Sequence, residues 1–267
     1  MDQIQLSDTW EQGDPYEQYV GRWSRRIAPL FLAWLGIPAR CRWLDVGCGT
    51  GALCAAIVDR CSPSAVGGVE PSAGFLKTAR EHLAGRVKLH QASATRIPLA
   101  DVSVDVVVSG LVLNFLPDPR AALAEMVRVT RRGGTIGAYV WDYAGKMEFM
   151  RIFWDAAVEL DLDAARLDEG TRFPLCRPKA LEELFTRAGL DGIEVRAIDL
   201  PTPFSSFEDY WRPFLGGQGP APAYAMSIDE SARKRLRERI RDGLPAQADG
   251  SISLTARAWA IRAIVPP

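Results

Sequence analysis

The chain has 267 residues, of which 48% are hydrophobic and 24% charged, which is ordinary for a globular protein with one substantial core. Its 32 Lys and Arg residues are balanced by 33 Asp and Glu residues, so no overall positive charge favours a nucleic acid or an anionic membrane as partner. We therefore expect a single domain, residues 1–267, that acts on a small molecule.

The sequence shows no pattern typical of secretion, a membrane span or a disulfide framework. Residues 1–5 contain no basic stretch followed by an apolar one, and the longest apolar run, residues 104–117, is too short to span a bilayer. The five cysteines are odd in number and form no C-x-x-C pair, which favours neither disulfides nor a zinc site. We expect a cytoplasmic protein with no bound metal.

The first half of the chain alternates short apolar runs with helical patterns. Residues 42–46 predict a strand that enters a glycine-rich loop, and a helix follows over residues 51–59. Two further helices are predicted to begin at Ser72 and at Asp118 followed by Pro119. The other strands of this half are predicted at residues 65–69, 87–92, 104–109 and 135–141. This alternation predicts a doubly wound α/β fold with a parallel sheet and helices on both faces.

Helical patterns dominate after residue 141. The helices of this half are predicted at residues 147–160, 178–188, 206–215 and 228–241. The stretch G-G-Q-G-P-A-P-A is expected to be a loop that joins the last two of these helices. A sixth strand is predicted at residues 193–200 and a seventh within residues 251–265.

The segment L-D-V-G-C-G-T-G predicts a loop that holds a nucleotide-like cofactor. Gly47, Gly49 and Gly51 allow backbone torsions and a close ligand approach that a side chain would block. With Ala52 they also satisfy the G-x-G-x-x-G/A dinucleotide pattern loosely, and Glu70 lies near the spacing of a ribose-binding acid. The glycines alone therefore fit nicotinamide, flavin and S-adenosylmethionine sites.

Asp45 distinguishes between these candidate cofactors, because it stands two residues before the first glycine. A carboxylate there would repel a pyrophosphate, whereas S-adenosylmethionine carries a sulfonium and an ammonium against a single carboxylate. Asp45 would then meet positive charge or brace the loop amides. The alternative is a bracing role without any ligand contact. The chemistry favours the methyl donor.

Five motifs together resemble the class I S-adenosylmethionine-dependent methyltransferases, in the subgroup that acts mostly on small molecules. They are L-D-V-G-C-G-T-G, G-V-E-P-S, I-P-L-A-D-V-S-V-D-V-V-V-S, L-V-L-N-F-L-P-D-P and R-R-G-G-T-I, and the resemblance covers residues 16–143. It implies a Rossmann-like, seven-stranded mixed sheet whose last strand is antiparallel, and S-adenosyl-L-methionine as the cofactor.

The resemblance also implies which residues bind the cofactor. Glu70 should bind the ribose hydroxyls, the backbone around Ala94 should face adenine, and the turn at Gly110 should lie near the methionine part. The full expected set is Tyr19, Arg22, Trp23, Asp45, Gly47, Cys48, Gly49, Gly51, Glu70, Pro71, Ser93, Ala94, Thr95, Ser109, Gly110 and Leu111.

Three positions leave alternatives open. Arg22 could pair with the cofactor carboxylate while Tyr19 and Trp23 cover it, or this stretch could be an amphipathic helix that packs on the core. The family often has Asp where Ser93 stands, so the contact with the adenine amino group should be shorter, water-mediated or absent. The common proline of R-P-G-G is Arg132 here, which should affect only a turn.

Ligands of open α/β sheets bind beyond the carboxyl ends of the strands, and three segments should converge there as a helical lid. These are approximately residues 1–35, 143–176 and 203–250, and the last two are rich in aromatic side chains. The aromatic residues favour a mostly apolar acceptor pocket, although a stripe at helical spacing can equally pack helices together. The expected substrate-binding residues are Asn114, Tyr143, Phe149, Phe153, Trp154, Tyr210, Trp211 and Phe214.

We expect transfer of a methyl group to a small apolar or aromatic molecule, mainly by proximity and alignment, since the donor is already activated. Asp142 is the best-placed general base if the acceptor must lose a proton, and its alternative role is to cap the following turn. His82 and His90 are not expected to reach the strand ends. The alternative function is a non-catalytic S-adenosylmethionine-binding or interaction subunit.

Two further patterns argue against a nucleic-acid substrate. The basic run at residues 233–239 alternates with apolar positions every fourth residue, which is typical of a solvated helix face. The segment Asn114-Phe115-Leu116-Pro117 lacks the consecutive prolines of the N-P-P-Y motif found in amino-methylating nucleic-acid and protein enzymes.

Overall fold

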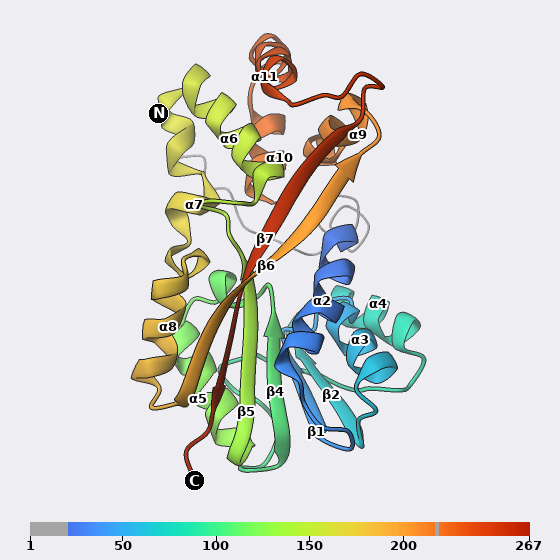
Figure 1. Ribbon diagram of the computed structural model, residues 1–267, viewed down its shortest axis with the longest axis vertical. Coiled ribbons are helices and arrows are strands. Elements are labelled where there is room, and N and C mark those ends of the chain that lie inside the picture. Colours follow the sequence, from blue (N-terminus) through green and yellow to red (C-terminus); the bar gives the residue numbers. More distant parts are fainter. Residues whose placement is uncertain (1–20, 217–218) are drawn as a thin grey trace. The chain divides into compact units, whose positions relative to one another are not determined.

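The computed structural model describes residues 21–216 and 219–267, which fall into two units (Figure 1). The sheet unit consists of Trp23–Trp141, Leu175–Ile198 and Ala258–Pro267. The described part of the helical unit consists of residues 21–22, Asp142–Pro174 and Asp199–Arg257 without 217–218. The expectation of one domain with lid segments remains a prediction.

Seven strands form one mixed sheet in the order β3-β2-β1-β4-β5-β7-β6. The pairs β1–β2, β1–β4, β2–β3 and β4–β5 are parallel, whereas β7 runs antiparallel to β5. The strands are β1 (Arg42–Val46), β2 (Ala65–Glu70), β3 (Lys88–Gln91), β4 (Val104–Gly110), β5 (Thr130–Trp141), β6 (Asp191–Phe204) and β7 (Ile252–Ile264). This topology confirms the predicted doubly wound, seven-stranded sheet with an antiparallel last strand.

Helices of the sheet unit cover both faces of its sheet (Figure 1). These helices are α2 (Arg22–Leu35), α3 (Ala52–Arg60), α4 (Ala73–Leu83), α5 (Pro119–Val129) and α8 (Pro178–Arg187). The helical unit contains α6 (Glu148–Leu160), α7 (Glu169–Arg172), α9 (Phe207–Trp211), α10 (Pro220–Ser227) and α11 (Glu230–Gly243). Among the residues that the structure describes, no helix is both long and apolar enough to cross a membrane.

Alternation along β5 divides the core of the sheet unit between the two faces. Ile136 and Ala138 are fully buried in one cluster with Met126 of α5 and other side chains of α5 and α8. On the other face the Phe31 ring of α2 lies 4.7 Å from the ring of Tyr139. The sheet is therefore covered on both sides, and its strand ends are left for ligands.

Local sequence signals place two of these helices as predicted. The Ser72 hydroxyl accepts a hydrogen bond from Phe75 N at the start of α4. The Asp118 carboxylate accepts one from Ala121 N, directly before Pro119, at the start of α5. Each cap satisfies an amide that the first helical turn leaves without a partner.

The predicted elements after residue 200 are wrong in two places. Helix α9 ends at Trp211 and continues as a 3₁₀ helix over Arg212–Gly216, because Pro213 cannot donate the amide hydrogen bond that an α-helix interior needs. The second half of the expected loop is the start of helix α10, in which Pro220 occupies the first turn, where its missing N–H costs nothing.

Candidate functional site

The loop after β1 is shaped by three glycines with φ of 75° at Gly47, 53° at Gly49 and 91° at Gly51. A Cβ added at Gly47 would lie 2.5 Å from the Val112 side chain, whereas one at Gly49 would meet no described atom within 4 Å. Gly47 is thus required by packing on its own chain, and Gly49 presents open backbone to a ligand. The predicted backbone torsions are confirmed.

Glu70, at the carboxyl end of β2, is the residue that braces this loop. Its Oε2 accepts a hydrogen bond from Gly49 N at 3.1 Å, and its Oε1 accepts one from Ser72 N at 2.9 Å. Burial raises the pKa of Glu70 above its usual value, although these two amide bonds act in the opposite direction. Each carboxylate oxygen has a second lone pair, which leaves acceptor capacity for a ribose hydroxyl.

Asp45 lies inside the protein with 1% of its surface exposed. Its Oδ2 accepts from the Cys54 thiol at 3.3 Å, and its Oδ1 has no hydrogen-bond partner in the described part of the chain. Burial is the main cause that raises the pKa of Asp45 to about 7, and the nearby Glu70 charge raises it further. Asp45 therefore contacts α3 at Cys54, while Glu70 takes the bracing role that the sequence suggested for Asp45.

The carboxyl end of β4 approaches the same loop. The Ser109 hydroxyl donates to Val46 O at 2.9 Å and so joins β4 to β1. Gly110 lies against Tyr139, whose hydroxyl oxygen would be 2.6 Å from an added Cβ. Leu111 has a φ of 64°, which is strained for a residue with a side chain, and its amide donates to Tyr139 O. The structure thus holds the turn Ser109–Leu111 in one fixed conformation.

The predicted adenine-facing segment follows β3. Thr95 N donates to the Ser93 hydroxyl at 3.2 Å, and the two hydroxyl oxygens lie 2.9 Å apart. The Ser93 hydroxyl therefore closes a local turn with Thr95. The carboxylate that the family often has at this position is absent here. The Ala94 side chain is buried in the main core cluster.

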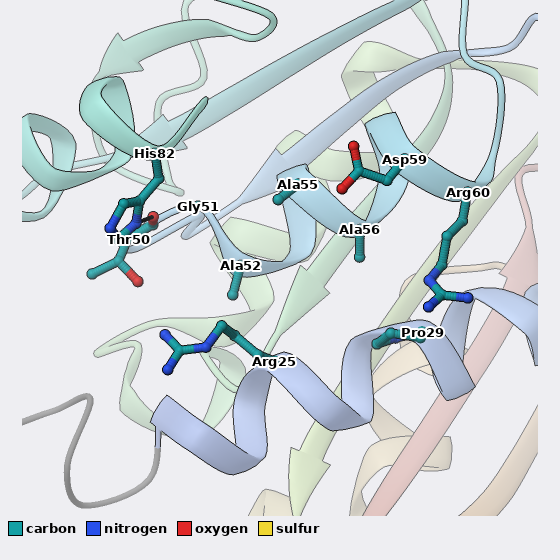
Figure 2. Close-up of a pocket in the computed structure, with 10 residues that line it drawn as sticks. All are labelled: Arg25, Pro29, Thr50, Gly51, Ala52, Ala55, Ala56, Asp59, Arg60 and His82. Atoms are coloured by element: carbon teal, nitrogen blue, oxygen red, sulfur yellow. Dashed lines mark hydrogen bonds between the residues drawn. The ribbon is translucent and has the colours of Figure 1, made fainter. Parts of the chain in front are cut away.

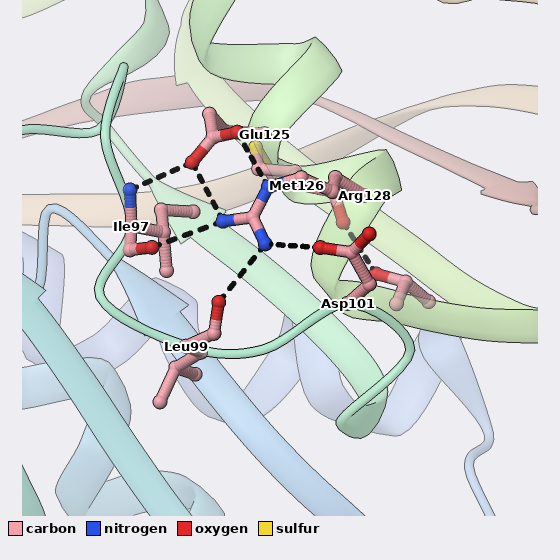
Figure 3. Close-up of polar contacts among 7 residues, drawn as sticks. Ile97, Leu99, Asp101, Glu125, Met126 and Arg128 are labelled. Carbon is pink, nitrogen blue, oxygen red and sulfur yellow. Dashed lines mark hydrogen bonds and ion pairs between the residues drawn. The ribbon is translucent and has the colours of Figure 1, made fainter.

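Arg128 of α5 fixes the chain that follows this segment (Figure 3). Its guanidinium bonds both oxygens of Glu125, at 2.6 and 2.8 Å, and Asp101 at 2.7 Å. It also donates to the carbonyl oxygens of Ile97 and Leu99 at 3.0 and 2.9 Å. All five guanidinium N–H groups are used, so the connection between β3 and β4 is tied to α5.

Arg22 and Trp23 begin helix α2, and Tyr19 lies outside the described residues. The Arg22 guanidinium donates to Asp209 at 3.1 Å and lies 4.8 Å from the centroid of the Phe204 ring. These partners belong to the helical unit, as Arg22 itself does. Trp23 is buried with 3% of its surface exposed, which agrees with the alternative of a helix packed on a core.

A cavity of about 650 Å³ lies beside the glycine loop, between α2, α3 and α4 (Figure 2). Thr50 and Gly51 of the loop line it, together with His82 of α4. The His82 Nδ1 is 3.2 Å from Thr50 O, and because a carbonyl only accepts, Nδ1 is the protonated nitrogen. His82 therefore contacts the glycine loop, while the expectation that it does not reach the strand ends stays a prediction.

Asp142, the candidate general base, follows β5 directly and belongs to the helical unit. Its Oδ2 accepts from Lys146 N at 3.0 Å, and its backbone oxygen accepts from Gly145 N and Met147 N. The structure therefore shows the turn-capping role, while a catalytic role stays a prediction. Tyr143 beside it is buried, with its ring 6.0 Å from that of Phe173.

The aromatic residues predicted to bind the substrate form the core of the helical unit. The Phe149 ring lies 4.7 Å from Phe214, the Phe153 ring lies 4.4 Å from Phe214, and the Tyr210 hydroxyl donates to Phe149 O at 2.8 Å. The members that are at most 3% exposed are Phe149, Phe153, Trp154, Tyr210, Trp211 and Phe214. Their packing role is thus shown, and contact with a substrate stays a prediction. Asn114 lies in the sheet unit, and its buried Oδ1 has no partner among the described residues.

Sequence reasoning missed a buried acid in the helical unit. Glu169 is 1% exposed, and its Oε2 accepts a hydrogen bond from the Trp154 indole. Its Oε1 has no partner in the part of the chain that the structure describes, and burial raises the pKa of Glu169 to about 8. Asp168, which precedes it, receives two bonds of 2.7 Å from Arg151. Nothing in the local sequence distinguishes Glu169 from an exposed acid at a helix start.

The basic run of α11 faces acids of its own unit. Arg237 and Arg241 both bond Glu208 and lie 5.1 and 4.3 Å from the centroid of the Phe207 ring. Arg239 bonds Glu159 at 2.7 Å. These three arginines bond two acids of their own unit, which agrees with the expected solvated helix face.

The residues around the glycine loop fit S-adenosylmethionine. Asp45 and Glu70 place two buried carboxyl groups at adjacent strand ends, and neither is paired with Lys or Arg in the described chain. The Asp45 Oδ1 has no partner there, and a Cβ added at Gly49 would meet no described atom within 4 Å. Two buried acids without a cation favour a ligand that carries positive charge. Among the described residues, no group of three or more His, Cys, Asp or Glu side chains could hold a metal ion.

Comparison with known proteins agrees with this fit. Residues 44–137 match the family model described as "Methyltransferase domain". An uncharacterized protein of Mycobacterium tuberculosis (strain ATCC 25618 / H37Rv) is 31% identical over 137 residues, 51% of this chain and 50% of that protein. The chain thus spans about half the length of the first curated relatives that it matches. The demethylmenaquinone methyltransferase of Staphylococcus aureus (strain JH9) is 29% identical over 189 residues, 66% of this chain and 76% of that enzyme.

A solved structure shares the fold over nearly the whole chain. Phosphoethanolamine N-methyltransferase 2 of Haemonchus contortus, in complex with phosphomonomethylethanolamine and S-adenosylhomocysteine, superposes with a TM-score of 0.58 at 17% identity. The match covers 95% of this chain and 56% of that one. At this identity the likeness is one of fold.

Proposed function

We propose that this chain, whose residues 44–137 form a class I S-adenosylmethionine-dependent methyltransferase domain, transfers a methyl group from that cofactor to a small apolar or aromatic molecule. The observation that carries the proposal is the pair of buried carboxyl groups, Asp45 and Glu70, beside the open backbone of Gly49. A cofactor with a sulfonium and an ammonium supplies the positive charge that no described Lys or Arg brings to this pair.

The roles of the cofactor-binding residues follow from their positions. Glu70 accepts from the ribose hydroxyls while it continues to hold the loop through Gly49 N. Asp45 turns its Oδ1 to the positive end of the cofactor, directly or through a water. Ser93 to Thr95 form one wall for adenine, held in place by the Arg128 contacts farther along the same connection. The turn Ser109–Leu111, at the end of β4, lies against the methionine part of the cofactor.

The proposed acceptor class rests on the helical unit and on one relative. The core of that unit is built from phenylalanine, tyrosine and tryptophan, which suits an apolar or aromatic ligand. The relative from Staphylococcus aureus is named for demethylmenaquinone, a molecule with an aromatic, apolar body. When bound, S-adenosylmethionine supplies an activated methyl group, so the chain needs chiefly to align the acceptor and to exclude water.

Thermal unfolding and a labelling reaction test the proposal. S-adenosylmethionine and S-adenosylhomocysteine, each at 100 times its dissociation constant, should stabilise the fold by about 2.7 kcal/mol, while NAD should not. Incubation with methyl-labelled cofactor and a metabolite extract should then give a labelled small molecule. Equal stabilisation by NAD, or none by either adenosyl compound, would refute the cofactor assignment. Stabilisation with no labelled product from any extract would favour the non-catalytic binding subunit.

A further inference from the structure

Three aromatic side chains and two acids form a cluster in the helical unit, which we call the Glu169 cluster. The centroid of the Trp154 ring lies 5.3 Å from that of Phe153 and 5.7 Å from that of Tyr224, and the Phe153 and Tyr224 centroids are 6.3 Å apart. The Trp154 indole donates a hydrogen bond to Glu169 Oε2. The Tyr224 hydroxyl donates one to Asp161 Oδ2 at 3.3 Å. Two of the three mutually packed rings therefore each hold a carboxyl group.

The second carboxyl oxygen of Glu169, Oε1, receives no hydrogen bond in the described part of the chain. Glu169 is 1% exposed, so bulk water does not take the place of a donor. A buried acceptor without a donor costs free energy, because it has lost its bonds to water on folding. Oε1 therefore favours the binding of a group that brings a donor to it.

No Lys or Arg of the described chain is bonded to this cluster. Glu169 and Asp161 form no ion pair there, and no cationic side chain lies over the three rings. Arg172 is the described cation whose charge acts on Glu169, and its guanidinium lies 5.2 Å from the centroid of the Phe173 ring. Carboxyl oxygens and the faces of aromatic rings both attract cations. The cluster thus combines two kinds of group that favour a positively charged ligand.

An organic ammonium ion matches these groups better than a neutral ligand does. Its N–H supplies a donor to Oε1, its charge pairs with the carboxylate, and the carbon body attached to it packs against the rings. We propose that Glu169 and the rings of the cluster bind the ammonium group of an aromatic amine, which is the methyl acceptor or a part of it. This inference rests on the proposed function and narrows its acceptor class to aromatic amines.

The cluster is closed in this structure, since Phe153 and Trp154 are at most 1% exposed and Tyr224 is 6% exposed. An amine therefore reaches Glu169 through local opening of the helical unit. Once it is inside, the surrounding rings shield the ion pair from water, which strengthens it. Burial raises the pKa of Glu169 to about 8, and a bound cation lowers that pKa and so favours the carboxylate.

Two probes of equal size isolate the charge. Phenethylamine carries an ammonium group where phenethyl alcohol carries a hydroxyl. Their affinities are measured by titration calorimetry on the full chain at pH 8, where a primary alkylamine is still protonated and Glu169 is partly ionised. We expect the amine to bind more tightly than the alcohol. Glu169→Gln should weaken the amine about ten- to hundredfold, the range for a hydrogen bond to a charged group, and change the alcohol less than about twofold.

Glu169→Gln keeps an acceptor for Trp154 and removes only the charge, and urea unfolding checks that the variant is folded. Glu238→Gln is the matched control, because Glu238 lies in the same unit with 55% of its side chain exposed. It should bind both probes as the unchanged protein does. Equal affinities of the unchanged protein for amine and alcohol would overturn the inference and leave Glu169 as a protonated acid of the core. An equal loss of both probes in Glu169→Gln, or a loss of the amine in Glu238→Gln, would overturn it as well.

Stabilisation by S-adenosylhomocysteine, measured on the same protein, separates this inference from the proposed function. A chain that S-adenosylhomocysteine stabilises and that shows no Glu169-dependent preference for the amine refutes the amine site alone. A chain that shows this preference without stabilisation by either adenosyl compound supports the amine site and refutes the proposed function.

Discussion

Asp45 is buried near Glu70, and a charged ligand at this position would change the protonation of its carboxyl group. Burial and the Glu70 charge raise the pKa of Asp45 to about 7, so the carboxyl group is partly protonated near neutrality. The Cys54 thiol also contacts Asp45 and donates a hydrogen bond to its Oδ2. A positively charged ligand favours the ionised form and lowers this pKa, so its binding releases a proton.

We predict that S-adenosylmethionine binds more weakly as the pH falls below about 7. The free protein binds more protons than the complex in this range, so the dissociation constant rises by up to about tenfold per pH unit. Asp45→Asn cannot titrate and should flatten this dependence. Calorimetric titrations from pH 5.5 to 8.5, repeated in two buffers of different ionisation enthalpy, measure the proton count directly. A pH slope that is the same in Asp45→Asn would assign the proton to another group.

The Asp142 carboxylate has two candidate roles, to cap the following turn or to act as a general base. Its contact with Lys146 N is satisfied within the turn, and Asn presents an oxygen to the same amide. We therefore predict that Asp142→Asn lowers kcat by less than about a hundredfold, the lower end of the range for a general base. The measurement is kcat at saturating substrate with cofactor affinity as the control. A much larger loss with unchanged cofactor affinity would make Asp142 the base.

Helix α5 holds the connection between β3 and β4 through Arg128. Its bonds to the Ile97 and Leu99 carbonyl oxygens hold the connection that begins with Ser93 (Figure 3). Replacing Arg128 by Met leaves Glu125 without its cation and frees this connection. The expected cost is about 1 to 3 kcal/mol of unfolding free energy, the range for a lost bond to a charged group.

We predict that Arg128→Met also weakens binding of the adenosine part of the cofactor. Residues Ser93 to Thr95, proposed to face adenine, would lose the support that Arg128 gives to the same connection. Titration with adenosine or with S-adenosylhomocysteine should show a several-fold loss in a variant that is still folded by circular dichroism. Arg120→Met is the control, since Arg120 lies on the same helix and is exposed. Unchanged adenosine affinity in folded Arg128→Met would limit this residue to a stabilising role.

The elements that sequence reasoning predicted correctly are those with a local cause. Ser72 and Asp118 cap helices through their own first turns, and Gly47 needs a positive φ within one loop. Helix α10 was missed because Gly and Pro residues suggest a loop, although proline at the first turn of a helix is favourable. A proline fits both a loop and the first turn of a helix, so the sequence alone does not distinguish these two structures at Pro220.

The parts of the site that sequence reasoning missed depend on packing between distant segments. His82 meets Thr50 because α4 packs beside the glycine loop, and 32 residues separate them. Glu169 is buried because α7 lies against Trp154 of α6. No spacing within either segment encodes these contacts, whereas Glu70 was found because it ends a strand next to the loop.

The two units differ in the composition of their cores. The main core cluster of the sheet unit consists mostly of leucine, isoleucine, valine and alanine, whereas the core of the helical unit is rich in aromatic side chains and contains an acid. Glu169 is that acid, and the charged groups that act on it are Asp168 and Arg172. Burial of a carboxyl group without a cationic partner makes the stability of this core depend on pH.

The sign follows from the two pKa values of Glu169, about 8 in the folded chain and 4.5 as its ordinary value. Below pH 4.5 both states are protonated, and the acid costs nothing. Between these values only the unfolded chain is ionised, so the free energy of unfolding falls as the pH rises, by at most about 1.4 kcal/mol per unit. We predict that Glu169→Gln, which stays neutral and keeps an acceptor for Trp154, removes this loss between pH 5 and 8. Urea unfolding at each pH measures it, with Glu182→Gln, at an exposed position of α8, as the control. An equal decline in Glu169→Gln would mean that other groups set the pH dependence and that Glu169 is ionised in the fold.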